Sequence, residues 1–168
     1  YLIGLRRPDV KLDFQALPQK YMRPKEDMAM VQLIVGSKGD GKTKHLLERV
    51  NSQIKTASGN IVYLDKSTKH MHELDNKVRL INVKDYPLKN SDEFIGFVCG
   101  IISQDYDLEQ MYVDSFLKVA NLEGEDLTDA LTQLNQISEQ FKVNFCLSIS
   151  VEEKDLPEFA KEQVIISC

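Results

Sequence analysis

The sequence predicts an α/β fold in which a mostly parallel β-sheet is covered by helices on both faces. Two patterns alternate along the chain. Short apolar runs rich in β-branched residues are typical of buried strands, and longer segments with apolar residues three and four positions apart are typical of helices. The 168 residues suffice for one domain with a real core, and 42% hydrophobic with 28% charged residues is ordinary for a globular protein. No internal repeat or low-complexity segment interrupts the alternation.

Each expected element follows from one of these two patterns. The expected strands are residues 31–35, 61–64, 78–83, 110–113, 145–149 and 164–166. The expected helices carry one apolar stripe each, over residues 46–54, 94–102 and 127–141. Ser91 is expected to cap the second helix, with Asp92 and Glu93 in its first turn. Pro157 marks a break near a further short helix.

Residues 1–29 are expected to be an N-terminal extension or linker, and residues 30–168 the folded domain. The extension carries six Lys or Arg residues against four Asp or Glu, whereas the whole chain has a net charge of −5. Apolar and charged residues alternate over 10–14 as in an edge strand, and Pro18 and Pro24 predict a linker after it. A basic arm could contact nucleic acid, but the net charge does not support nucleic-acid binding.

Cysteine usage and hydropathy indicate an intracellular protein. Cys99, Cys146 and Cys168 are widely spaced, which fits neither a disulfide framework nor a four-cysteine zinc site. No apolar run approaches the length needed to span a bilayer, and no secretory signal is recognisable. The expected location is the cytoplasm.

The most specific pattern in the chain lies between the first strand and the first helix. It reads Gly36-Ser37-Lys38-Gly39-Asp40-Gly41-Lys42-Thr43, which matches G-x-x-x-x-G-K-T. Glycines let backbone N–H groups turn inward around an anion, and the positive end of the following helix points to the same place. Lys42 is expected to reach the β- and γ-phosphates, and the Thr43 hydroxyl to coordinate Mg²⁺. All eight residues are therefore predicted to bind nucleotide, the alternative being a glycine-rich turn without a ligand.

These residues resemble the phosphate loop (Walker A) of the P-loop NTPases. The resemblance implies a three-layer P-loop NTPase fold over residues 30–168 that binds Mg²⁺ and ATP. The run Met111-Tyr112-Val113-Asp114 is similar to a Walker B strand, whose aspartate binds the Mg²⁺ shell beside Thr43. Lys42 and Asp114 are thus the expected catalytic residues, and Thr43 and Asp114 the expected metal ligands. The layout is similar to the thymidine-kinase and RecA-like side of the superfamily, and to small bacterial ATP-binding proteins without an established role.

The chain departs from that pattern at the residue after Asp114. Hydrolytic RecA-like members and thymidine-kinase-like enzymes usually carry a glutamate beside the Walker B aspartate, and here Ser115 occupies that position. Glu152 or Glu153 after the fifth strand could supply the base, or Asp65 after the second strand. The alternative for each is a solvated surface charge.

Several other polar residues near the ends of strands have a simpler interpretation. Ser148 and Ser150 alternate with apolar neighbours and are expected to be structural rather than sensors of the γ-phosphate. His70 and His72 lie in a polar loop and are expected to have no nearby third ligand, which predicts solvated rather than metal-bound side chains. Residues 76–79 place arginine where the guanine-reading N-K-x-D motif has its aspartate, which favours ATP over GTP.

The predicted function is slow ATP hydrolysis, or ATP-dependent switching coupled to a protein partner. In-line attack of water on the γ-phosphate would be assisted by Lys42 and Mg²⁺, which neutralise the developing charge. One alternative is a nucleoside or nucleotide kinase of the thymidine-kinase-like type, against which stand Ser115 and the absence of a cysteine-built zinc lid. Another is a non-catalytic module in which ATP orders a surface for assembly.

Overall fold

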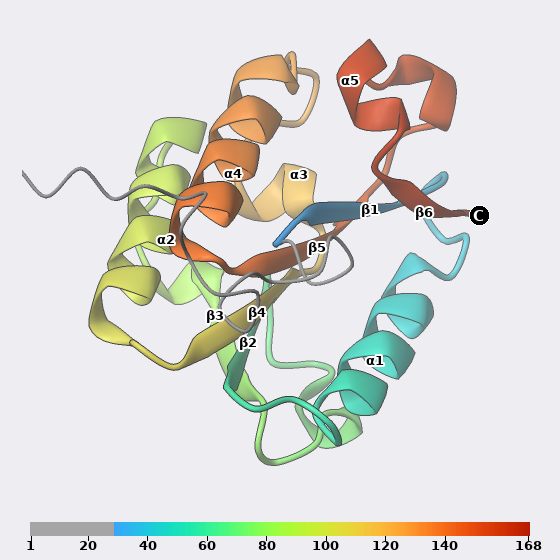
Figure 1. Cartoon of the computed structure of the whole chain (residues 1–168). Helices are drawn as coiled ribbons and strands as arrows, with labels where there is room; N and C mark the ends of the chain where they lie inside the picture. Colours follow the sequence, from blue (N-terminus) through green and yellow to red (C-terminus); the bar gives the residue numbers. More distant parts are fainter. Residues whose placement is uncertain (1–28) are drawn as a thin grey trace, which may run out of the picture.

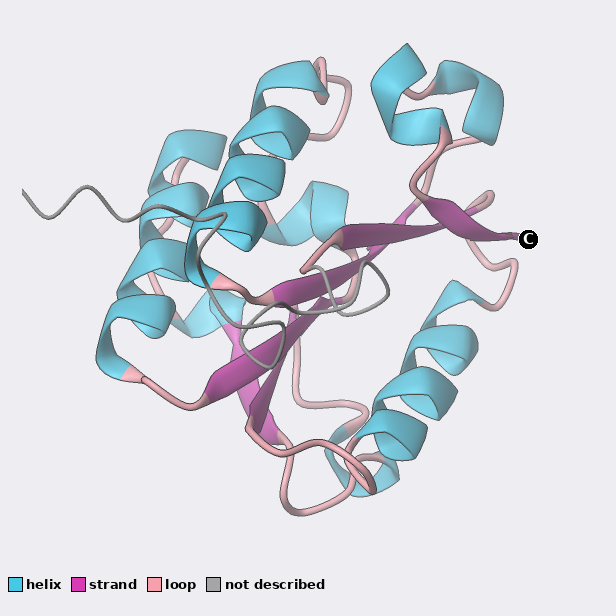
Figure 2. Cartoon of the chain, in the orientation of Figure 1, coloured by secondary structure: helices cyan, strands magenta, loops and turns pink. Residues whose placement is uncertain are grey.

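The strands of the domain form one parallel sheet, as the sequence predicts. The computed structural model describes residues 29–168. Its strands are β1 (Val31–Val35), β2 (Asn60–Asp65), β3 (Arg79–Asn82), β4 (Leu108–Val113), β5 (Asn144–Ile149) and β6 (Val164–Ser167). Their order in the sheet is β3-β2-β4-β5-β1-β6, and every neighbouring pair is parallel (Figure 2). The edge strand expected near residues 10–14 and the linker after it lie outside the described residues.

Helices complete a three-layer arrangement. The α-helices are α1 (Lys42–Gln53), α2 (Ser91–Gln104), α3 (Phe116–Val119), α4 (Thr128–Phe141) and α5 (Glu158–Lys161). Three short 3-10 turns are η3 (Met71–Glu73), η4 (Val83–Asp85) and η5 (Glu153–Asp155). Helix α1 lies on one face of the sheet, and α2, α3 and α4 lie on the other (Figure 1). None of the helices within residues 29–168 has the length and apolar character needed to cross a bilayer.

The pleat of the sheet divides the core into two parts. In β1, Leu33 and Val35 pack into the larger part, beneath α2 and α4, while Ile34 packs against Leu46 and Val50 of α1. All five side chains are completely buried. Burial on both faces explains why the central strands are largely apolar, and each fully buried apolar side chain stabilises the fold by about 1.5–3 kcal/mol.

Two local features differ from the sequence-based expectation. The prediction that Ser91 caps α2 is wrong, because Asn90 is the capping residue and Ser91 is the first residue of the helix. Asn90 has an extended backbone, and its side-chain oxygen accepts a hydrogen bond from Glu93 N at 2.9 Å. Helix α3 was not expected, since four residues are too few to show a helical period; it follows Ser115, whose φ is 51°.

The parallel topology gathers the ends of the strands at one edge of the sheet. Gly36 follows β1, Asp65 ends β2 and Asp114 follows β4. The N–H of Asp114 donates to the carbonyl of Leu64 at 2.8 Å, which ties the ends of β4 and β2 together. Ligands of open parallel sheets bind outside this edge, so it is where the chemistry of the chain is expected.

Candidate functional site

Three glycines with positive φ allow the loop between β1 and α1 to change direction. Gly36, Gly39 and Gly41 have φ values of 152°, 89° and 87°, in the range that residues with a side chain rarely adopt. Residues 37–41 are exposed, and α1 begins immediately afterwards at Lys42. The strand, glycine loop and helix expected from the sequence are therefore all present.

Gly36 is needed for a second reason, which is the close approach of the chain after β6. A Cβ atom at Gly36 would lie 2.8 Å from the Cβ of Cys168, closer than real Cβ contacts. The N–H of Cys168 donates to Val35 O at 2.8 Å, and the N–H of Gly36 donates to Val151 O at 3.0 Å. The base of the loop is thus fixed by the segments after β5 and β6.

Lys42 folds back over its own loop. Its Nζ donates a hydrogen bond to the carbonyl of Ser37 at 2.8 Å, and the side chain is 7% exposed. The amine therefore lies over the loop rather than in open solvent, where it can meet an anion held by the loop.

Within the described residues, the N-terminus of α1 has neither a side-chain cap nor an acidic residue of its own. Gly41 precedes the helix without a side-chain capping bond, and no acidic residue lies in the first turn. Helix α2, in contrast, has a capping Asn90 and two acidic residues in its first turn. The free N–H groups and positive end of the α1 dipole favour an anion at the loop.

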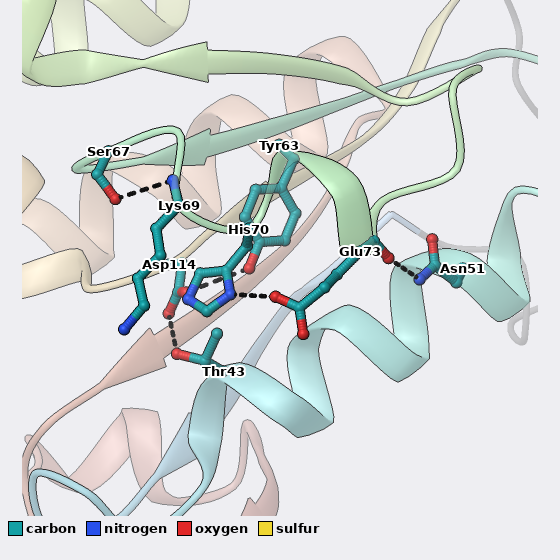
Figure 3. A network of polar contacts seen from close by, with 8 residues as sticks. All are labelled: Thr43, Asn51, Tyr63, Ser67, Lys69, His70, Glu73 and Asp114. Atoms are coloured by element: carbon teal, nitrogen blue, oxygen red, sulfur yellow. Dashed lines mark hydrogen bonds and ion pairs between the residues drawn. The ribbon is translucent and has the colours of Figure 1, made fainter.

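Asp114 is the most heavily hydrogen-bonded carboxylate of the site. Its Oδ1 accepts from Thr43 Oγ1 at 3.2 Å and from Ser148 Oγ at 2.5 Å. The N–H of Ser115 donates to the same oxygen at 2.9 Å. Its Oδ2 accepts from the hydroxyl of Tyr63 at 3.2 Å, as Figure 3 shows together with the Thr43 bond. These donors orient a 2%-exposed carboxylate and stabilise its negative charge.

Asp65 lies beside Asp114 and is only partly satisfied. Its Oδ1 accepts from Lys66 N at 2.6 Å, whereas its buried Oδ2 has no hydrogen-bond partner within the part of the chain that the structure describes. Burial, together with the negative charge of Asp114, raises the pKa of Asp65.

His70 belongs to the same group of side chains. Its Nδ1 contacts Glu73 Oε2 at 2.5 Å (Figure 3). One ligand-type atom from each of Asp65, His70 and Asp114 lies within 4.8 Å of the others. The prediction that His70 has no nearby third ligand is wrong, because the loop after β2 folds it onto two carboxylates distant in the sequence. His72 is exposed, as predicted.

A cleft of about 720 Å³ opens over the loop and Asp114. Lysines from four segments line it, namely Lys38, Lys42, Lys66, Lys69 and Lys118. The carboxylates that line it are Asp114 and Glu123. The cleft is therefore positively charged although the chain carries a net charge of −5, which suits a ligand with several negative charges. Desolvation and the neighbouring Lys118 lower the pKa of Lys66, a sign of how closely these cations gather.

The structure brings most of the predicted site residues to this cleft. Those lining it are Lys38, Gly39, Gly41, Lys42, Thr43 and Asp114. Gly36 lies buried at the base of the loop, Ser37 supplies the carbonyl that holds Lys42, and the N–H of Asp40 donates to the same carbonyl at 3.2 Å. Glu152 and Glu153, considered as bases, are exposed and do not line the cleft.

Some residues of the site carry no signal in the sequence. Tyr63 sits inside an apolar strand and reads as core, although its hydroxyl reaches Asp114. Ser148 and Ser150 both line the cleft, and Ser148 also donates a hydrogen bond to Asp114. Lys66 directly follows the end of β2, and this position is the one sequence feature that could have indicated its place in the site. Glu123 lies in the loop before α4.

Comparisons with known proteins show a similar backbone fold in two solved structures. Neither a protein-family model nor a curated protein matches the sequence. Among solved structures, the chain is similar to the flagellar accessory protein FlaH from Methanocaldococcus jannaschii, with 14% identity and a TM-score of 0.49 over 77% of this chain and 64% of that one. It is also similar to the pCW3 conjugation coupling protein TcpA, a monomer form with ATPgS, with 13% identity and a TM-score of 0.44 over 84% of this chain and 48% of that one. The chain thus spans slightly under two thirds of the first structure and about half of the second.

Proposed function

We propose that residues 30–168 form a P-loop domain that binds Mg·ATP and acts as a slow ATPase or an ATP-dependent switch with a protein partner. One observation carries the proposal. The glycine loop that follows β1 places Lys42 over its own concavity and brings the Thr43 hydroxyl to Asp114. A basic residue, a hydroxyl and a carboxylate in this arrangement meet the needs of a polyphosphate with its cation.

Each residue has a distinct role in binding. Lys42 exchanges its hydrogen bond to Ser37 O for charge-assisted bonds to the phosphates, and the uncapped start of α1 adds its N–H groups and dipole. Thr43 and Asp114 are the residues that would hold Mg²⁺, and both are oxygen donors of the kind this ion takes. When bound, Mg²⁺ neutralises phosphate charge. Ser148 and Tyr63 hold the Asp114 carboxylate in the required orientation.

The base is proposed to be adenine. Recognition of guanine in the N-K-x-D pattern depends on a carboxylate, and Arg79 occupies the corresponding position of residues 76–79. Arg79 lies at the start of β3, away from the end of the strand where the cleft opens. GTP is therefore expected to bind no better than ATP.

Hydrolysis is expected to be slow because no carboxylate adjoins Asp114 in the chain. Ser115 follows it, and Asp65 is 1% exposed and so poorly accessible to water. Glu123 is exposed and lines the cleft, which makes it the residue that we propose to orient a water near a bound phosphate. Such a loosely held base is expected to give a low rate.

Calorimetric titration of ATP and GTP with Mg²⁺, followed by product analysis of the same samples, tests the proposal. Lys42→Ala is expected to weaken ATP binding about tenfold or more, because it removes charge-assisted contacts worth about 1.5–3 kcal/mol each. Lys44→Ala is the matched control, since Lys44 is exposed on the same helix and does not line the cleft. Equal ATP affinity in wild type and Lys42→Ala would overturn the assignment of the loop.

The products decide between the proposed activity and its rivals. Release of phosphate supports the ATPase, and its reduction in Glu123→Gln would support the role of that residue. Transfer of labelled phosphate to a nucleoside from a panel of acceptors would instead identify a kinase. Tight Mg·ATP binding with hydrolysis at background would identify a non-catalytic, ATP-ordered module.

A further inference from the structure

Asp65 and His70, to which the proposed nucleotide site gives no role, form a cluster with Asp114. One carboxylate or imidazole atom from each residue lies within 4.8 Å of the others, and Asp65 and Asp114 are 1% and 2% exposed. The buried Oδ2 of Asp65 has no hydrogen-bond partner in the described part of the chain. A buried carboxylate oxygen without a partner is costly, so an unpartnered one beside two other potential ligands indicates a missing cation.

His70 is oriented as a metal-binding histidine would be. Its Nδ1 contacts the carboxylate of Glu73 at 2.5 Å, and the other ring nitrogen is directed toward Asp114 (Figure 3). A carboxylate on one ring nitrogen holds the proton there and leaves the other nitrogen free to bind a metal. Glu73 is itself held, because its carbonyl accepts from Asn51 Nδ2 of α1 at 2.7 Å.

One oxygen of each carboxylate, Oδ1, is already engaged in hydrogen bonds. Asp114 Oδ1 takes the bonds from Thr43 and Ser148, and Asp65 Oδ1 takes the bond from Lys66 N. Among residues 29–168, Asp65 Oδ2 has no hydrogen-bond partner, and Asp114 Oδ2 accepts one bond, from Tyr63. Two oxygens and one imidazole nitrogen therefore remain available for one cation.

We propose that Asp65, His70 and Asp114 form a divalent-metal site that binds a first-row transition metal in the absence of nucleotide, in preference to Mg²⁺. Imidazole is a ligand of transition metals, whereas Mg²⁺ takes oxygen ligands and gives up its water reluctantly. A site with one nitrogen and two carboxylate oxygens thus selects the softer ion. It shares Asp114 with the proposed Mg²⁺ position but does not require the phosphate loop.

Binding of Mn²⁺ to nucleotide-free protein tests the proposal. Electron paramagnetic resonance of free and bound Mn²⁺ is expected to show one bound ion per chain, resisting competition by a large excess of Mg²⁺. Electron spin-echo modulation of the bound ion is expected to show coupling to an imidazole nitrogen. Absence of Mn²⁺ binding, absence of the nitrogen coupling, or displacement by equal Mg²⁺ would each overturn the proposal.

Substitutions at His70 and Glu73 test which side chains bind the metal ion. His70→Gln is expected to lose the nitrogen coupling and to weaken Mn²⁺ binding about tenfold or more, and Glu73→Gln to weaken it by about tenfold through the second ring nitrogen. His72→Gln is the matched control, because His72 is exposed two residues along the same turn, and it should behave as wild type. Far-ultraviolet circular dichroism checks that each variant is folded; unchanged Mn²⁺ binding in folded His70→Gln would refute the site.

The outcome is independent of the proposed ATP binding. Lys42→Ala is expected to lose ATP affinity without weakening Mn²⁺ binding, because Lys42 contributes no ligand to the cluster. His70→Gln is expected to lose Mn²⁺ binding while the phosphate loop remains intact. A protein that binds Mn²⁺ but not ATP would refute the function proposed above and support the metal site, and the reverse result would do the opposite.

Discussion

The hydroxyl of Thr43 donates a hydrogen bond to Oδ1 of Asp114 at 3.2 Å, although 71 residues separate them in the chain. The bond joins the start of α1 to the end of β4, and β5 lies in the sheet between β4 and β1, the strand that precedes α1. The glycine loop and the buried carboxylate are therefore structurally coupled. We expect a substitution at Thr43 or Asp114 to change the position of the other side chain.

The Thr43 hydroxyl is expected to matter mainly when Mg²⁺ is present. Thr43→Ala removes an oxygen ligand and should reduce the Mg²⁺-dependent part of ATP affinity about tenfold or more, because a charge-assisted contact is worth about 1.5–3 kcal/mol. Thr43→Ser keeps the hydroxyl and should retain most of the affinity. Titration of ATP with Mg²⁺ and with EDTA separates the two parts. An equal loss in both conditions would contradict the role assigned to Thr43.

Ser148 is expected to support both stability and ATP binding. Its buried hydroxyl donates to Asp114 Oδ1, and Ser148→Ala should destabilise the fold by about 1–3 kcal/mol and weaken Mg·ATP binding. Ser138→Ala is a control of similar cost, because the buried Ser138 hydroxyl donates to Val143 O at 2.7 Å. Urea unfolding and ATP titration should show that both variants lose stability while Ser148→Ala alone loses ATP affinity.

Gly36 is expected to tolerate no side chain. Gly36→Ala places a Cβ 2.8 Å from Cys168 Cβ at a φ of 152°, and we expect a loss of about 1–3 kcal/mol in the free energy of unfolding. Gly100→Ala is the contrasting control, since Gly100 lies in α2 with nothing within 4 Å of the added atom. That change should stabilise the protein by about 0.8–1 kcal/mol through helix propensity. Chemical denaturation of both variants measures the difference, and a stable Gly36→Ala would contradict the close contact.

Cys146 is expected to be unreactive and to weaken the fold at high pH. Burial raises the pKa of its thiol from 9.0 to about 12. Between these values the native protein keeps the proton that the unfolded chain releases, so the native state binds more protons and stability falls as pH rises. Cys146→Ala should flatten this part of the stability curve measured by urea unfolding.

Alkylation provides an independent measurement on the same protein. Near neutral pH, iodoacetamide should label the exposed Cys168 and leave Cys146 unmodified until the chain is unfolded. Mass spectrometry of the peptides identifies the labelled position. Rapid labelling of Cys146 in folded protein would contradict the burial described for β5.

The sequence was most informative where burial acts on both faces of a strand. Residues 31–35 and 145–149 are largely apolar, interrupted only by Gln32 and Ser148, because β1 and β5 lie inside the sheet with helices on both sides. The parallel order then follows from the alternation with helices, and it brings Thr43 and Asp114 together as expected. The start of β4 at Leu108 was missed, since the first residues of a strand carry little period.

Sequence patterns do not predict the contacts that loops make in this structure. His70 appears in the sequence as part of a polar loop, and only the folding of residues 66–74 over the ends of β2 and β4 brings it to Asp65. Tyr63 alternates with apolar neighbours and gives no hint that its hydroxyl bonds Asp114. The choice between Asn90 and Ser91 as a cap similarly depends on backbone angles, because both residue types form caps.

The bond from Lys42 to the carbonyl of Ser37 has a consequence for which molecules can enter. An incoming ligand has to replace that carbonyl as the acceptor for the ammonium group, and a phosphate does so with a stronger, charged oxygen. A nucleoside without phosphates offers no such oxygen and leaves the lysine where it is. Under the proposed function, the loop is therefore expected to select ligands by their phosphate groups, whichever base they carry.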